Sequence, residues 1–329
     1  MGNPISVSQD AGMTSERGGS SGSPVQMQAR TQAVESWPPL PLEAWQDTYA
    51  TLHLWTQIVG KVRLALTPPL NHWWAVTLYV DPRGLTTGSI PYGSDSFEVA
   101  FDFLDHTLWV RASTGGTRAM VLYPRSVADF YREFLAILRS LGMDVRINPL
   151  PQEIANPIPC DEDHEHAAYD AAYATRWWRI LAQSDHVLQQ FRTGFLGKSS
   201  PVHFFWGGFD LAVTRFSGRR APERPGADRV TREAYSHEVS SCGFWPGTAG
   251  GPVAEPAYYA YMAPEPAGFA EAGVQPAAAS YQRELGEFIL PYEAVRTAAD
   301  PDAVLFAFAQ SAYEVGATLA GWDRAALER

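Results

Sequence analysis

Two histidines and an aspartate in the second half of the sequence have side chains suited to proton transfer or to metal binding. His203 precedes an aromatic run, Asp210 follows Gly207-Gly208, and His237 lies in a later apolar segment. If their strands converge on one cavity, these three side chains form an acid–base set, and the same ligand types suit zinc, iron or manganese. Their spacing matches no established metal motif, so a divalent metal and a purely structural role both stay open as alternatives.

Five further residues are candidates for substrate binding. Arg215 could hold an anionic group, because a guanidinium pairs well with carboxylate or phosphate. Successive side chains alternate between the two faces of a strand, which places Asp210 and Thr214 on one face and Arg215 on the other. The remaining candidates are His72, Glu238 and Trp206.

Helical and extended patterns alternate along the chain and predict the elements that carry these side chains. Apolar residues at three- and four-residue steps predict a helix from about Trp45 to Leu66, stopped by Pro68-Pro69. The segment Trp73–Val80 is predicted to be extended. Further strands are predicted around residues 97–123, and a helix capped by Ser126 follows them.

The second half repeats this outline. A helix containing Trp177 and Leu188 precedes strands at about 202–216, 236–244, 257–262 and 287–292, and a final helix starts after Pro301. Antiparallel hairpins next to helices indicate an α+β fold. We therefore predict two pseudo-repeated halves, each helix–antiparallel sheet–helix, in one compact unit with a pocket between them.

The predicted boundaries are a tail at residues 1–36, a first half at 37–150, a proline-rich and acidic linker at 151–165, and a second half at 166–329. The tail contains no Phe, Trp or Tyr and is predicted to be disordered. Six arginines fall between Arg215 and Arg232, largely in a predicted loop at 218–232, where they could recruit an anion.

Several long strings resemble an uncharacterised bacterial family, a domain of unknown function. They include Leu52–Lys61 (LHLWTQIVGK), Ser200–Gly218 (SPVHFFWGGFDLAVTRFSG), Tyr235–Gly247 (YSHEVSSCGFWPG) and Gly286–Val295 (GEFILPYEAV). The resemblance runs from about Trp37 to the C-terminus. It implies a single folded unit across both halves and implies no catalytic role for any residue.

Composition narrows the function classes. The chain has 329 residues, 25 Lys and Arg against 36 Asp and Glu, and a formal net charge of −11. An acidic chain repels phosphate backbones, so nucleic acid is not an expected partner, and no long apolar run predicts a membrane span. Two cysteines give no disulfide framework, and a cytoplasmic location is expected. We expect a small-molecule enzyme whose ligand could be anionic, with a non-catalytic ligand-binding protein or a structural protein as alternatives.

Overall fold

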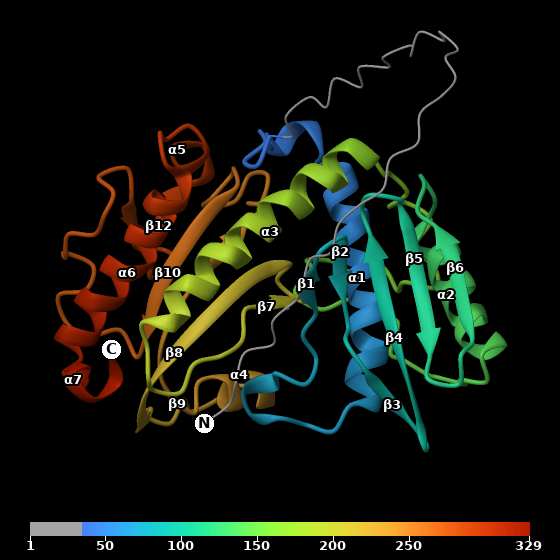
Figure 1. Ribbon diagram of the computed structural model, residues 1–329, viewed down its shortest axis with the longest axis horizontal. Helices are drawn as coiled ribbons and strands as arrows, with labels where there is room; N and C mark the ends of the chain where they lie inside the picture. Colours follow the sequence, from blue (N-terminus) through green and yellow to red (C-terminus); the bar gives the residue numbers. More distant parts are fainter. Residues whose placement is uncertain (1–34) are drawn as a thin grey trace, which may run out of the picture. The chain divides into compact units, whose positions relative to one another are not determined.

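The computed structural model describes residues 35–329, which fold around two antiparallel sheets and two long central helices (Figure 1). Contacts unite Ser36–Arg329 into one compact unit. The predicted disordered tail at 1–36 lies almost wholly outside the described residues. The predicted mixture of helices and antiparallel sheets is confirmed: the fold is α+β.

Helix α1 (Gln46–Leu66) is buried around nearly its whole circumference, unlike a surface helix with a single apolar stripe. Its buried polar side chains bond to main-chain atoms of the predicted linker and of the residues just before it. Gln57 donates to the Gln152 carbonyl and accepts from the Gln152 amide, both at 2.8 Å. Lys61 donates to the carbonyl groups of Asn148 and Leu150. The linker is therefore held along α1.

The first sheet is antiparallel, and α1 and α2 (Val127–Ser140) lie behind it in Figure 1. The Ser126 side chain accepts a hydrogen bond from the Asp129 amide and so caps α2, as predicted. The sheet order is β1-β2-β4-β5-β6, with β3 paired to β4. The strands are β1 (Tyr79–Asp81), β2 (Gly84–Thr86), β3 (Ile90–Tyr92), β4 (Asp95–Asp102), β5 (Thr107–Ala112) and β6 (Thr117–Val121).

The prediction of an extended segment at Trp73–Val80 was wrong for most of its length. Residues Asn71–Trp73 form the 3-10 turn η2, and β1 begins only at Tyr79. His72 and Trp73 have φ angles of 58° and 61°, in the left-handed region that non-glycine residues seldom occupy. Two consecutive residues in that region reverse the chain, so a strand cannot pass through them.

The second sheet has the order β11-β12-β10-β9-β8-β7. Helices α3 (Ala171–Thr193) and α6 (Pro301–Leu319) pack against each other and cover one face of it (Figure 1). The strands are β7 (His203–Phe205), β8 (Asp210–Arg220), β9 (His237–Trp245), β10 (Ala257–Ala263), β11 (Ser280–Gln282) and β12 (Glu287–Pro291). The short helices are η1 (Leu42–Ala44), α4 (Arg229–Ala234), α5 (Tyr292–Arg296) and α7 (Arg324–Leu327).

A two-residue bridge connects the two sheets. The amide of Leu78 donates to the carbonyl of Phe204, and the amide of Phe204 donates back to Leu78, both at 2.9 Å. The core is shared as well, because Trp177 contacts the rings of Trp45 and Phe103 from the first half and stacks on Phe209 from the second. The two halves are thus one packing unit, although their strand orders differ.

Candidate functional site

The second sheet has one face that α3 and α6 do not cover. We call it the polar face and define it by Asp210, Thr214, Ser241, Tyr259 and Tyr261, which alternation and register place on the same side of β8, β9 and β10. Thr214 Oγ1 lies 3.0 Å from Ser241 Oγ, across two neighbouring strands. The predicted sharing of one face by Asp210 and Thr214 is confirmed.

Arg215 lies on the opposite face, under α3 and α6, and is 1 % exposed. Its guanidinium packs 3.4 Å from the ring centre of Phe191 and 4.3 Å from that of Tyr313, and it donates to the Phe191 carbonyl. It therefore fastens α3 and α6 to the sheet. This placement gives Arg215 no route to a ligand bound on the polar face.

Asp210 starts β8 directly after a sharp turn. Gly207 and Gly208 precede it, and Phe209 has a φ of 59°. The hydroxyl of Tyr259 donates to Asp210 Oδ2 at 2.5 Å. Burial raises the pKa of Asp210 to about 7; the Tyr259 hydrogen bond opposes this rise, and the nearby Glu153 carboxylate adds to it. Asp210 can therefore give and take a proton near neutral pH.

Two more carboxyl groups surround Asp210. A Cβ built on Gly208 would lie 2.9 Å from Asp210 Oδ1 and 3.5 Å from Glu153 Oε2, so both carboxylates meet at this glycine. Burial raises the pKa of the Glu153 carboxyl, and Asp228 adds to the rise. Burial and Asp210 raise the pKa of Glu287 to about 7. Among residues 35–329, no Lys or Arg pairs with any of these three carboxyl groups.

A hollow of about 380 Å³ opens beside Glu153. Its walls are α1, the segment 151–166 and the loop at Thr248 and Ala249, so elements from both halves enclose it. Tyr49 and His53 of α1 face it. Glu153 lines the hollow, and the Asp210 carboxylate contributes to a rise in the pKa of Tyr49 on its wall, after the larger effect of burial.

His53 is neutral in this arrangement. Its Nε2 lies 2.7 Å from the carbonyl oxygen of Gly207, which can only accept, so Nε2 carries the proton. Burial lowers the pKa of His53 to about 4. The imidazole thus fastens α1 to the turn that precedes Asp210. The sequence patterns identified neither His53 nor Glu153, because both reach the site through long-range packing.

His203 is 1 % exposed, and neither ring nitrogen has a hydrogen-bond partner. Its ring contacts the edges or faces of Trp74, Tyr79 and Phe205. The pKa of His203 is lowered to about 3, mainly by burial, with smaller contributions in the same direction from Arg63 and Arg192. It lies opposite Ala212, so it shares the polar face with Asp210, but it contacts aromatic rings while Asp210 bonds Tyr259.

His237 lies at the other end of the polar face. Leu211 pairs with Phe244, so Asp210 is opposite Trp245, eight residues along β9 from His237. At about 3.3 Å per residue this separates the two by roughly 25 Å. His237 instead lies near His72, with ring centres 5.8 Å apart. The structure therefore does not bring His203, Asp210 and His237 into one cluster.

The remaining predicted site residues are His72, Trp206 and Glu238, and each has different contacts. His72 and His203 both contact Trp74. Trp206 is buried, and its indole N–H donates to the Val76 carbonyl at 2.7 Å. Glu238 faces away from the polar face and accepts hydrogen bonds from Ser217 and Arg219.

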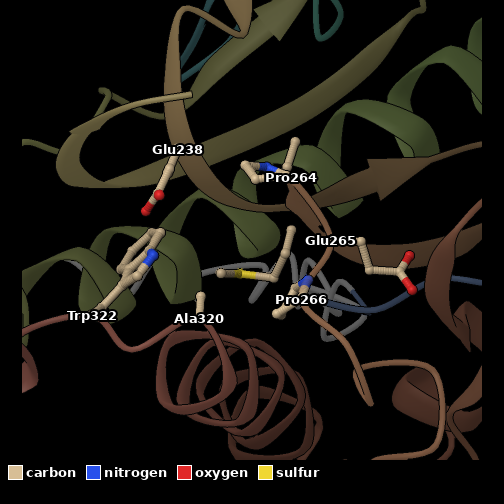
Figure 2. A pocket seen from close by; sticks show the side chains of 8 residues that line it. Glu238, Pro264, Glu265, Pro266, Ala320 and Trp322 are labelled. Atoms are coloured by element: carbon tan, nitrogen blue, oxygen red, sulfur yellow. The ribbon is translucent and has the colours of Figure 1, made fainter. Parts of the chain in front are cut away.

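Glu238 also lines a second hollow, of about 190 Å³, together with Met262, Pro264 and Trp322. Figure 2 shows Glu238 and Trp322 on one side of this hollow and Pro264 and Pro266 on the other. The Glu238 carboxylate is already paired with Arg219, at 2.7 Å.

No group of three or more His, Cys, Asp or Glu side chains in the described part of the chain is arranged to hold a metal ion. Within that same part, no helix combines the length and apolar character needed to cross a bilayer.

The fold and site define an α+β protein with a carboxyl-rich polar face. The chain belongs to a family of unknown function, DUF5996, whose profile matches residues 37–329. This confirms the resemblance to an uncharacterised domain family. No curated protein and no solved structure matches the sequence at a significant level.

Proposed function

We propose that the protein is a small-molecule enzyme in which Asp210 transfers a proton to or from a ligand bound beside Glu153. The supporting observation is the pair of carboxyl groups that meet at Gly208, next to a hollow of about 380 Å³. Burial raises the pKa of the Asp210 carboxyl to about 7, which suits proton transfer at neutral pH.

The charges around the site favour an uncharged or cationic ligand over the anionic one that the sequence left open. Glu153, Asp210 and Glu287 have no basic partner in residues 35–329, and Tyr49 and Trp245 supply aromatic surface nearby. Aromatic faces bind sugars, flat rings and ammonium groups. Each residue then has a role: Asp210 transfers the proton, Tyr259 fixes its carboxyl, and Glu153 contacts the ligand in the hollow.

The proposal includes two further features of the protein, its location and its internal duplication. Cys160 and Cys242 are both free and buried, which supports a cytoplasmic location. Each half starts with a long helix, continues with six strands and ends in helix, with α4 added between β8 and β9 of the second half, and this shared outline supports an internal duplication.

The test uses a panel of uncharged chromogenic substrates, p-nitrophenyl glycosides and p-nitrophenyl esters, with the full chain. We expect wild-type turnover of at least one compound and a loss of about 100-fold or more in Asp210→Asn and Glu153→Gln. Glu265→Gln is the control, because Glu265 bonds Tyr281 away from the hollow. Equal rates in all variants would contradict the proposal. Ligand binding that needs Asp210 but gives no product would replace it by a binding function.

A further inference from the structure

Four basic side chains meet at the end of the polar face that is far from Asp210. They are His72 from η2, Lys198 from the segment before β7, Arg220 from the end of β8 and His237 from the start of β9. We call them the basic cluster. His237 pairs with Arg220 across the strands, and its ring lies 5.8 Å from that of His72.

The ammonium group of Lys198 is held in place by uncharged groups only. Its Nζ lies 2.8 Å from His72 Nε2 and 5.1 and 4.9 Å from the ring centres of Trp74 and Phe216. His72 Nδ1 lies 3.2 and 3.3 Å from the carbonyl oxygens of Glu233 and Ala234. Nδ1 therefore carries the proton, and Nε2 accepts from Lys198. Lys198 is exposed, so its other two N–H groups remain open to a ligand.

The basic cluster lacks a counter-charge. Within residues 35–329, no ion pair involves Lys198, Arg220, His72 or His237. The neighbouring Arg219 differs, because it pairs with Glu238 on the opposite face. Burial lowers the pKa of His237, and the charges of Lys198 and Arg220 lower it further. Burial and Lys198 likewise lower the pKa of His72.

The backbone beneath the cluster is strained. His72 and Trp73 both have positive φ angles, a conformation that persists in non-glycine residues only where the surroundings hold it. This conformation aims His72 at Lys198. The strained turn thus positions both the His72 ring, which packs on Trp74 and Phe216, and the Lys198 ammonium group bonded to it.

We propose that the basic cluster binds the phosphate group of a small molecule. A phosphate group has several oxygen acceptors that point in different directions. The cluster offers donors from three places in the fold, on Lys198, Arg220 and His237. A carboxylate is instead matched best by the two parallel N–H groups of a single guanidinium. Trp74 and Phe216 form an apolar floor beside these donors. The site shares no residue with the carboxyl pair at Gly208, so its failure would leave the proposed function untouched.

The test titrates inorganic phosphate into the full chain at pH 6.5 and low ionic strength, with the histidine ring signals followed by NMR. We expect saturable shifts at His237 and His72 and a rise in the pKa of His237 on binding. The charged groups facing His237 are His72, Lys198 and Arg220, while α4 presents the carbonyl groups of Glu233 and Ala234. Absence of saturation would overturn the proposal.

Matched variants locate the site. Lys198→Met keeps the apolar part of the side chain and removes its charge. The double variant Lys198→Met/Arg220→Gln should weaken phosphate binding about tenfold or more. Arg219→Gln removes an equal charge from the neighbouring position on the other face and should leave the affinity within about twofold. Equal weakening by Arg219→Gln would show a diffuse charge effect and overturn the site. Sodium acetate is the second probe, and competition as strong as that of phosphate would overturn the assignment to phosphate.

Discussion

The phenol of Tyr259 on β10 crosses over Gly243 on β9 to reach Asp210 on β8. Tyr259 pairs directly with Gly243, and a Cβ built on Gly243 would lie 2.6 Å from the Tyr259 hydroxyl. Only a residue without a side chain lets the phenol lie flat across the middle strand. The hydrogen bond at Asp210 therefore depends on three strands in register, and on a glycine that carries no chemistry of its own.

Tyr259→Phe is expected to raise the pKa of Asp210 above its value of about 7. The phenol donates to the carboxylate and so favours its charged form, while burial acts in the opposite direction and would remain. Carbon-13 NMR of the aspartate carboxyl carbons over pH 4–9 measures this directly, with Asp210→Asn assigning the signal. A lower pKa in Tyr259→Phe would show that the phenol does not stabilise the carboxylate.

Asp210→Asn is expected to make the protein more stable above pH 7. The pKa of Asp210 is raised in the folded state, so the folded chain keeps a proton between about pH 4 and 7 that the unfolded chain has lost. Stability therefore falls as the pH rises through this range. Removing the buried charge should raise the free energy of unfolding at pH 8, on the order of 2 kcal/mol, as measured by urea unfolding.

Asp228→Asn is the control for that experiment. The Thr231 amide lowers the pKa of Asp228, so its carboxylate contributes stability above about pH 4 and the substitution should give no gain at pH 8. A wild type more stable than Asp210→Asn at pH 8 would mean that the Asp210 charge is compensated within the fold.

His203→Leu is expected to stabilise the protein at pH 5. The pKa of His203 is lowered to about 3, so the folded chain holds it neutral while the unfolded chain binds a proton below pH 6.5. Stability is therefore lost as the pH falls below 6.5. Urea unfolding at pH 5 should show a gain of about 2 kcal/mol for His203→Leu, from that proton alone.

Two further results interpret this variant. His164→Leu alters an exposed histidine and should change little. A loss of stability in His203→Leu at both pH 5 and pH 8 would show that the imidazole makes a contact worth more than the cost of burying its two unpartnered nitrogens.

Gly60→Ala is expected to destabilise the protein even though alanine favours a helix by about 1 kcal/mol. Gly60 lies in the middle of α1, where a Cβ would overlap the indole ring of Trp206. Relieving the overlap must displace a ring whose N–H bonds Val76, at a cost of about 1–3 kcal/mol. Urea unfolding should show a smaller effect of Gly60→Ala in a Trp206→Leu background. Equal effects in both backgrounds would place the cost elsewhere.

Local periodicity predicted the features of the fold that depend on neighbouring residues alone. Alternation along β8 correctly separated Asp210 and Thr214 from Arg215, and the helix predicted from about Trp45 to Leu66 ends where Pro68-Pro69 requires. The site itself depends on contacts between distant residues. Glu153 reaches Asp210 because Gln57 and Lys61 hold the linker along α1, and no local pattern encodes those bonds.

The distance between His237 and Asp210 could not be predicted from the sequence, for a different reason. Both residues lie on the predicted face, but their separation depends on the register of β8 against β9 and on the length of each strand. Spacing along the chain does not determine either quantity. Likewise, the apolar residues of Trp73–Val80 suggested a strand, and only the positive φ angles of His72 and Trp73 reveal a reversal.

The paired bonds between Leu78 and Phe204 have a consequence for anyone who divides this chain. A fragment ending near residue 150 would expose Leu78 at an unpaired strand end and would leave Trp45 and Phe103 without Trp177. A fragment starting near residue 166 would expose Phe204 in the same way. Each fragment alone would expose an unpaired strand edge and would be prone to aggregate. The two fragments expressed together would cover each other's exposed surface and assemble by complementation.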